Sequence, residues 1–439
     1  MREIDTAEPA RRIDSVAVIG AGTMGAGIAA ASAAAGCRVL VLDTDPAAAQ
    51  RALDGVDEEC RDLVSIGTVD DRLDDIAGYD WVCEAVIEDL AAKRELFERL
   101  EAARSDGSVI SSNTSGIPLR QISDGMSERF RHDVAITHFF NPVRVMKLFE
   151  LVPGEDTDPE VIDAFARFGA ERLGKGVVHA KDTVNFIGNR IGCFFMLRGL
   201  HVAKPFLADG MTQETVDAVL GAPIGLPPTG LYGLIDLIGL DVMELVGANL
   251  AQNLPPGDRG LDFTAFPEAE QAMADRGQLG RKTGGGFSRR VKLDDGSRKA
   301  ETFDLVAGEW RAASPPDLEG VPADLGAVLF ADSVQGELAR HAFGGTLTYA
   351  ADLVPEIADD IANVDNAIRW GFNWVHGPFE MLDHLGPDLV IEFLRSVDEP
   401  LPAMLAVLEA SGQPTFYGEA ADGTRTQLMP DGTVAPVDR

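Results

Sequence analysis

One short pattern near the amino terminus constrains the fold more than any other part of the sequence. Residues 15–19 (SVAVI) are a β-forming run, a glycine-rich turn follows at residues 20–25, and residues 26–35 favour a helix. Residues 38–43 (RVLVLD) form a second apolar run. A strand, turn, helix and strand within about thirty residues are typical of a parallel α/β sheet. We therefore expect an α/β fold with a Rossmann-type doubly wound sheet at the start of the chain.

The turn carries three glycines, Gly20, Gly22 and Gly25, in the spacing G-x-G-x-x-G. The first permits a tight turn, the second lets a pyrophosphate approach the backbone, and the third allows close helix–strand contact. Asp43 ends the next apolar run, where a carboxylate binds the ribose 2′-hydroxyl of NAD and repels the 2′-phosphate of NADP. The predicted cofactor is NAD. FAD on the same fold and a glycine-rich turn without a ligand are the alternatives.

Polar side chains lie at or near the ends of three further apolar runs. Asn113 and Ser115 come after residues 108–112, His138 and Asn141 stand at the end of residues 134–140, and Glu150 lies within residues 146–152. Ligands of an open α/β sheet bind at the carboxyl ends of its strands. A neutral imidazole suits removal of a hydroxyl proton near pH 7, and a carboxylate on its other nitrogen orients the ring. His138 and Glu150 are therefore the candidate base and its partner. A histidine in the core and a serine in a turn are the plainer interpretations.

The character of the sequence changes near Lys181, where long helical patterns replace the alternating ones. Two later segments resemble each other. The first runs from Asp217 through GLYGLIDLIGLD, and the second from Asp365 through GPFEMLDHLGPD. This repeat predicts a duplicated all-α carboxyl-terminal domain, with chance similarity between helices as the alternative. The predicted domains are a Rossmann domain (1–183), a first helical domain (184–285), a linker with short strands (286–344), a second helical domain (345–412) and a tail with short strands (413–439).

Charge and cysteine content limit the partners. The formal net charge is −33, which disfavours binding to nucleic acid or to an anionic membrane surface. The four cysteines form no C-x-x-C pair and have no other candidate metal ligands nearby in the sequence, so we expect free thiols and no metal. Residues 1–14 are charged and lack the apolar core of a signal peptide. A cytoplasmic location without a membrane span is the expectation.

The motifs taken together resemble the L-3-hydroxyacyl-CoA dehydrogenase family of fatty-acid β-oxidation. The matching stretches are GAGTMG, SSNTSG, THFFNPVRVMKLFELVP, LGKGVVHAKDTVNFIGNRIG and GRKTGGGF, and the similarity covers nearly the whole chain. The resemblance implies NAD-dependent oxidation of an (S)-3-hydroxyacyl-CoA. It implies that His138 is the general base, that Glu150 orients it, and that Ser115 and Asn189 position the substrate oxygens. The implied NAD-binding residues are Gly20, Gly22, Thr23, Met24, Gly25, Asp43, Glu88, Lys93, Asn113, Ser115, Asn141 and Lys282.

Because its helical domain is duplicated, the chain resembles one group within this family. This group is the dehydrogenase part of bifunctional proteins that also carry an enoyl-CoA hydratase. The expected partners are an acyl-CoA thioester and an enoyl-CoA hydratase or thiolase, in a monomer or homodimer. One segment departs from the family, because residues 43–84 contain no lysine where relatives have a longer, lysine-containing helical arm that contributes to CoA binding. Acyl and CoA specificity is therefore left open, and the alternatives are a dehydrogenase of a non-CoA hydroxy acid and a non-catalytic NAD-binding protein.

Overall fold

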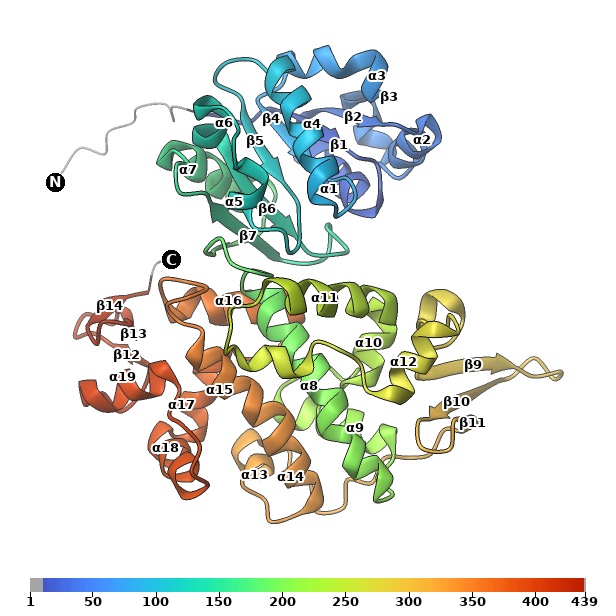
Figure 1. The fold of residues 1–439 in the computed structure, drawn as a ribbon, viewed down its shortest axis with the longest axis vertical. Coiled ribbons are helices and arrows are strands. Elements are labelled where there is room, and N and C mark those ends of the chain that lie inside the picture. The colour runs from blue at the N-terminus through green and yellow to red at the C-terminus, as the bar shows by residue number, and fades with distance from the viewer. Residues whose placement is uncertain (1–10, 438–439) are drawn as a thin grey trace. The chain divides into compact units, whose positions relative to one another are not determined.

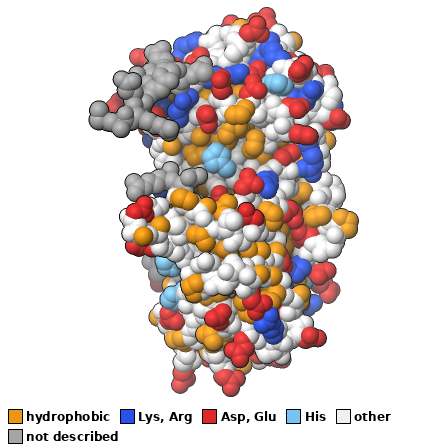
Figure 2. Space-filling view, turned by 90° about the vertical axis from the view of Figure 1, so that its left-hand side faces the viewer, with side chains coloured by type: hydrophobic (Ala, Val, Ile, Leu, Met, Phe, Trp, Pro, Cys, Tyr) orange, Lys and Arg blue, Asp and Glu red, His pale blue; other side chains and the backbone are white. Residues whose placement is uncertain are grey.

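The computed structural model describes residues 11–437 and divides the chain into two compact units, Met1–Phe186 and Ile187–Arg439. Residues 1–10 lie outside the described range, and they belong to the segment expected to lack a signal peptide. The last two residues of the predicted tail also lie outside it. On the face drawn in Figure 2, acidic and basic side chains of the described residues are interspersed rather than gathered into one basic patch.

The amino-terminal unit is built on one eight-stranded sheet in the order β3-β2-β1-β4-β5-β6-β7-β8. All neighbours pair in parallel except β6 and β7, which are antiparallel. The predicted doubly wound sheet is confirmed, and its strand order reverses between β1 and β4, the place where such folds bind ligands. The strands are β1 (Ser15–Ile19), β2 (Arg38–Asp43), β3 (Val64–Thr68), β4 (Trp81–Glu84), β5 (Val109–Ser112), β6 (Val134–Phe139), β7 (Leu148–Pro153) and β8 (Gly176–His179).

Apolar runs explain the central strands, because both faces of a parallel sheet are covered by helices and every residue is buried. All five residues of β1 are buried, and helices flank the sheet in Figure 1. Helix α4 buries Phe97 and Leu100, and Asp89 accepts a hydrogen bond from the Ala92 amide and caps its first turn. The helices are α1 (Thr23–Ala34), α2 (Pro46–Asp54), α3 (Val69–Arg72), α4 (Leu90–Ala103), α5 (Leu119–Ser123), α6 (Glu128–Asp133) and α7 (Pro159–Arg167).

The second unit is helical and carries two small antiparallel sheets, each of three strands. Helix α8 is long and apolar enough to cross a membrane, but 61% of its most apolar window is buried inside the protein, as in a core helix. The helices are α8 (Gly188–Ala208), α9 (Gln213–Val219), α10 (Tyr232–Ile238), α11 (Leu240–Asn253), α12 (Glu268–Asp275), α13 (Leu325–Leu329), α14 (Val334–Ala339), α15 (Gly345–Asp352), α16 (Ile361–Phe372), α17 (Pro378–Leu385), α18 (Pro387–Ser396) and α19 (Ala403–Ser411). The strands are β9 (Ser288–Lys292), β10 (Arg298–Asp304), β11 (Glu309–Ala312), β12 (Tyr417–Glu419), β13 (Arg425–Leu428) and β14 (Val434–Pro436).

The repeated sequence corresponds to a repeated set of hydrogen bonds. Asp217 accepts from the amides of Tyr232 and Gly233 at the start of α10, and Asp365 accepts from the amides of Phe379 and Glu380 in α17. Because the two aspartates hold corresponding helices in the same way, the similarity is structural as well as sequential.

A second pair of aspartates extends the repeat into the strands. Asp236 accepts from the amides of Phe287 and Ser288, and Asp383 accepts from those of Phe416 and Tyr417. Each repeat therefore ends where a carboxylate binds the entry to a three-stranded meander. This is the physical reason for the similar spacing of the two aspartates in both segments.

The region expected as a linker with short strands, residues 286–344, differs from the expectation in its second half. Strands β9 to β11 occupy its first half, and β9 pairs with β10 as an antiparallel hairpin. Two short helices, α13 (Leu325–Leu329) and α14 (Val334–Ala339), lie there instead and bury Leu325, Val328 and Leu338. The short apolar runs of this segment acquire their helical form by packing on the other helices.

Candidate active site

The glycine turn has the geometry that its sequence predicts. Gly20 has φ of +104°, and a Cβ there would lie 2.5 Å from the Ala85 carbonyl oxygen. A Cβ on Gly25 would lie 1.8 Å from the carbonyl oxygen of Gly20. A Cβ on Gly22 would have no atom within 4 Å, so this position faces open space. Protein packing thus requires glycine at positions 20 and 25, whereas Gly22 leaves room for a ligand.

The amino terminus of α1 offers free donors beside that space. Gly22 is its N-cap residue, no side chain caps the helix, and its first turn contains no acidic residue. The first amides of a helix lack partners within the helix, and its dipole favours an anion at this end. Thr23 is exposed and Met24 is half-buried against the core. These features fit a bound pyrophosphate.

Asp43 lies at the mouth of the same turn. Its Oδ2 accepts a hydrogen bond of 2.6 Å from the Ala21 amide, and its Oδ1 accepts one of 2.9 Å from the Asp45 amide. The half-exposed carboxylate is therefore held against the glycine turn, where the adenosine ribose of a dinucleotide would lie.

His138 and Glu150 are brought together as the sequence predicts. They lie opposite each other in the antiparallel pair of β6 and β7. His138 Nδ1 and Glu150 Oε2 are 2.6 Å apart, with side chains 5% and 0% exposed. With Nδ1 facing the carboxylate, Nε2 is the nitrogen left to act on a substrate. The imidazole also contacts the rings of Phe140 and Phe186, at centroid distances of 4.7 and 5.6 Å.

The loop after β5 is hydrogen-bonded both to the strand that carries His138 and to Glu88, which follows β4. Asn113 Oδ1 accepts a hydrogen bond of 3.0 Å from the amide of Phe139, the residue after His138. Glu88 Oε1 accepts hydrogen bonds from the Thr114 hydroxyl at 2.6 Å and from the Ser115 amide at 3.0 Å. Asn113 and Ser115 are half-buried at this edge. Both are thus held close to the elements that carry the His138–Glu150 pair.

Lys93 does not present its ammonium to solvent. Its side chain is 1% exposed and lies 2.7 Å from Glu84 Oε1 and 3.4 Å from Glu88 Oε2. Glu88 and Lys93 are residues that the resemblance implies as contacts of NAD, and both side chains have protein partners in the structure. Glu84 was not singled out from the sequence, although a carboxylate ending an otherwise apolar strand was the available signal.

Three other candidate residues lie apart from this cluster or in the second unit. Asn141 is exposed, just beyond β6. Asn189 is half-buried in the first turn of α8. Lys282 pairs with Asp241 at 2.6 Å within the helical unit. Their contacts with cofactor and substrate remain predictions from the resemblance.

The sequence did not indicate one residue that packs on the candidate base, or one ion pair in the loop after β6. Phe186, which packs on the imidazole, has φ of +49°, a conformation that is uncommon for a bulky residue. Arg144, just beyond β6, forms a two-pronged ion pair with Asp57 at 2.6 and 3.0 Å. This guanidinium lowers the pKa of the Asp57 carboxyl. Phe186 lay in a quoted motif, but nothing local indicated its contact with His138.

A metal has no evident place in the described part of the chain. No group of three or more His, Cys, Asp or Glu side chains there could hold one. The four cysteines are free, and burial raises the pKa of Cys83, beside Glu84 in β4, to about 12. The thiol of Cys83 is therefore protonated at neutral pH.

Comparison with known proteins gives matches over the whole chain. Residues 15–183 match the model of the 3-hydroxyacyl-CoA dehydrogenase NAD-binding domain, and residues 186–290 match that of its C-terminal domain. A Bacillus subtilis protein named "Probable 3-hydroxyacyl-CoA dehydrogenase" is 33% identical over 98% of this chain and 57% of its own length. A Deinococcus radiodurans protein of the same name is 37% identical over 70% of this chain and 92% of its own length.

A solved structure extends the likeness in fold to the helical repeat. The Escherichia coli structure titled as 3-hydroxybutyryl-CoA dehydrogenase superposes with a TM-score of 0.68 at 23% identity. The alignment covers 92% of this chain and 100% of that one. By contrast, this chain spans only 57% of the length of the Bacillus subtilis relative.

The strand order, the glycine turn and Asp43 define the amino-terminal unit as an NAD-binding domain of the Rossmann class. Together with the matches to both family domains, they establish that the chain belongs to the 3-hydroxyacyl-CoA dehydrogenase family.

Proposed function

We propose that this protein oxidises the 3-hydroxyl group of an (S)-3-hydroxyacyl-CoA to a ketone with NAD, and that His138 is the general base. The observation that carries the proposal is the buried contact of 2.6 Å between His138 Nδ1 and Glu150 Oε2. A carboxylate in this place fixes the imidazole tautomer and stabilises the imidazolium that forms when a proton is taken up. The family and its NAD-binding domain give the cofactor and the reaction class.

The reaction balances with one proton and one hydride. NAD supplies the hydride acceptor when it is bound. His138 Nε2 takes the hydroxyl proton as the hydride leaves carbon 3, and the carbon–oxygen bond becomes a carbonyl. Glu150 holds the imidazole throughout. In this proposal Ser115 and Asn189 hold the substrate oxygens, and the glycine turn holds the pyrophosphate.

Asp43 is proposed to determine the preference for NAD. We expect Asp43→Asn to weaken NADH binding modestly and to improve NADPH binding, because the amide can still accept from the Ala21 amide but no longer repels a 2′-phosphate. The ratio of the two dissociation constants should move by about tenfold or more toward NADPH, the equivalent of about 1.4 kcal/mol. Fluorescence titration with both dinucleotides measures this ratio.

Asp45→Asn is the matched control for this change. Asp45 is two residues away, carries the same charge and caps α2 through the Ala47 amide. Its substitution should leave the NADH-to-NADPH ratio within about twofold. An unchanged ratio in Asp43→Asn would mean that the ribose is recognised elsewhere.

A second candidate function is a dehydrogenase of a hydroxyacyl compound without CoA. The observation in its favour is the composition of residues 43–84, which contain no lysine. The arginines of this segment are already engaged: Arg51 pairs with Asp45, Arg72 pairs with Asp75, and Arg61 binds backbone carbonyls. This segment therefore offers little to a CoA phosphate.

The two candidates are distinguished by reducing three related compounds with NADH and following its absorbance. These are acetoacetyl-CoA, acetoacetyl-N-acetylcysteamine and acetoacetate. We expect kcat/KM for acetoacetyl-CoA to exceed that for the truncated thioester by about tenfold or more, since remote binding contacts contribute to catalysis. Equal values for the two thioesters would favour the second candidate. No turnover of any of the three would contradict the proposed function.

The chemistry also suggests the neighbouring reactions. A 3-hydroxyacyl thioester arises by hydration of an enoyl thioester, and a 3-oxoacyl thioester is a substrate for thiolytic cleavage. An enoyl-CoA hydratase or a thiolase is therefore the proposed partner. A cytoplasmic location is proposed because all four cysteines are free, as expected in a reducing compartment.

A further inference from the structure

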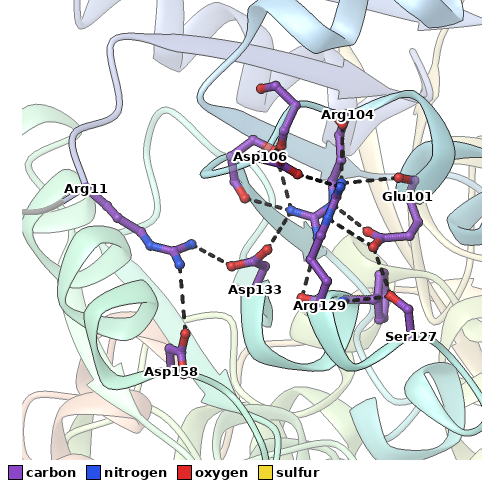
Figure 3. Close-up of polar contacts among 11 residues, drawn as sticks. Arg11, Glu101, Arg104, Asp106, Ser127, Arg129, Asp133 and Asp158 are labelled. Atoms are coloured by element: carbon purple, nitrogen blue, oxygen red, sulfur yellow. Dashed lines mark hydrogen bonds and ion pairs between the residues drawn. The ribbon is translucent and has the colours of Figure 1, made fainter.

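Besides the His138–Glu150 pair, two buried pairs of a Lys or Arg with a carboxylate lie at opposite edges of the sheet in the described part of the amino-terminal unit. Glu84 and Lys93 lie at the carboxyl edge, where β4 ends. Arg104 and Asp133 lie at the amino edge, ahead of β5 and β6, with a separation of 2.9 Å and side chains 0% and 8% exposed. Figure 3 shows the amino-edge cluster, in which Arg11 also reaches Asp133. Only the carboxyl-edge pair is next to the residues proposed for cofactor and substrate.

Glu84 is fully buried and uses both carboxylate oxygens. Its Oε1 accepts from Lys93 Nζ at 2.7 Å and from the Val86 amide at 2.7 Å. Its Oε2 accepts from the Ser112 hydroxyl at 2.5 Å. Glu84 is also in register with Ile19 of β1 on one side and with Ser112 of β5 on the other. The strand that carries this carboxylate thus lies between the strands that precede the glycine turn and the Asn113–Gly116 loop.

A second route leads from Glu84 to the same loop through Lys93. The Lys93 ammonium lies 3.4 Å from Glu88 Oε2. The other oxygen of Glu88 accepts from the Thr114 hydroxyl, the Ser115 amide and the Gly116 amide, at 2.6, 3.0 and 3.2 Å. The loop is therefore attached to Glu84 at its start, through Ser112, and along its length, through Lys93 and Glu88.

The stability of the fold does not account for a buried pair at this place. Removing two charges from water costs about as much as their attraction returns, and apolar residues of similar size often do as well. What the pair does supply is a defined position for the groups bonded to it. Those groups include the loop whose Asn113 binds the amide next to His138.

We propose that Glu84, through Lys93 and Glu88, is a positioning residue that holds the Asn113–Gly116 loop in the geometry required for catalysis. The expected effect on catalysis rests on the proposed function. The expected effect on the loop rests on the hydrogen bonds alone. Glu84 itself touches neither the cofactor nor the substrate in this account.

The test compares Glu84→Gln, Lys93→Met and the double variant carrying both. Each single change leaves one buried charge without its partner, so we expect a lower Tm for both. The double variant removes both charges and should recover most of that loss in Tm. Its kcat should nevertheless remain about ten- to hundredfold below the wild type, because the loop is held less precisely.

The matched control is Arg104→Met combined with Asp133→Asn, at the opposite edge of the same sheet. It should change Tm without lowering kcat by more than about twofold. Ser112→Ala is the mild companion variant, because it keeps the ion pair and removes one hydrogen bond to Glu84. We expect it to fold and to lose kcat by a few fold, so that the proposal is tested even if the charge variants do not fold.

Amide hydrogen exchange of residues 113–117 gives a readout that needs no substrate. Faster exchange in the double variant and in Ser112→Ala, but not in the control, is the expected result. Wild-type exchange in this loop, or wild-type kcat in the double variant, would overturn the proposal. If the wild-type protein reduces no 3-oxoacyl thioester, the proposed function fails, and the exchange measurement still decides whether Glu84 positions the loop.

Discussion

His138→Ala is expected to lower kcat by about 10²- to 10⁴-fold, the usual contribution of a general base. The imidazole is the proposed acceptor of the hydroxyl proton, and Glu150 holds its Nδ1 at 2.6 Å. NADH affinity should remain near the wild-type value, because the glycine turn and Asp43 belong to other elements. Steady-state reduction of acetoacetyl-CoA and fluorescence titration of NADH measure the two quantities.

Two companion variants make this result specific. His132→Ala removes a half-exposed histidine of the same domain that lies 3.2 Å from Asp158, and it should leave kcat within about twofold. Glu150→Gln should also lower kcat, since a neutral amide orients the ring but does not stabilise the imidazolium. Unchanged turnover in His138→Ala would remove this residue from the mechanism. Loss of NADH binding in His138→Ala would show that its effect is not confined to proton transfer.

Gly25→Ala is expected to destroy NADH binding and to destabilise the amino-terminal unit. Its methyl group would lie 1.8 Å from the Gly20 carbonyl oxygen, a backbone atom that cannot rotate away. Helix α1 would have to move off the turn, at a cost of about 3 kcal/mol or more in the free energy of unfolding. We expect NADH affinity to fall by about a hundredfold or more, because charge-assisted hydrogen bonds contribute about 1.5–3 kcal/mol each.

Gly22→Ala separates the ligand effect from the packing effect. An alanine at this position meets no atom within 4 Å and needs no positive φ, so Tm should stay close to the wild type. The methyl group would nevertheless occupy the space that a pyrophosphate needs, and NADH affinity should fall by about tenfold or more. Wild-type NADH affinity in Gly22→Ala would place the pyrophosphate elsewhere. Wild-type stability in Gly25→Ala would contradict the packing described for the turn.

Elements with a strong local pattern could be predicted from the sequence. Helix α4 is such an element, since its apolar spacing and its capping aspartate are both local features. Strands β3 and β8 were missed. β3 reads VSIGT and buries only its first residue well, and β8 has four residues, so neither carries a clear apolar pattern. Their conformation depends on pairing with β2 and β7, which no local window contains.

The candidate site divides in the same way. The glycine turn, Asp43 and the His138–Glu150 pair follow from residue types at fixed spacings beside recognisable strands, and the structure brings each of them to the expected edge. The proximity of His138 and Glu150 needed only that two successive strands pair as neighbours. The partners of Lys93 could not be inferred, because Glu84 and Glu88 approach it from a strand end and a loop whose positions depend on the whole sheet.

The sequence by itself determined the class of fold, the cofactor turn and the chemistry of the candidate base, because these rest on short-range spacing and on intrinsic side-chain properties. Only the tertiary structure decided which charges are buried together and which strand neighbours set the register. It also decided which ring packs on the imidazole. Those outcomes depend on contacts between residues far apart in the chain. Burial strongly changes the energy of a charge or a hydrogen bond, and the residue type alone does not show which groups are buried together.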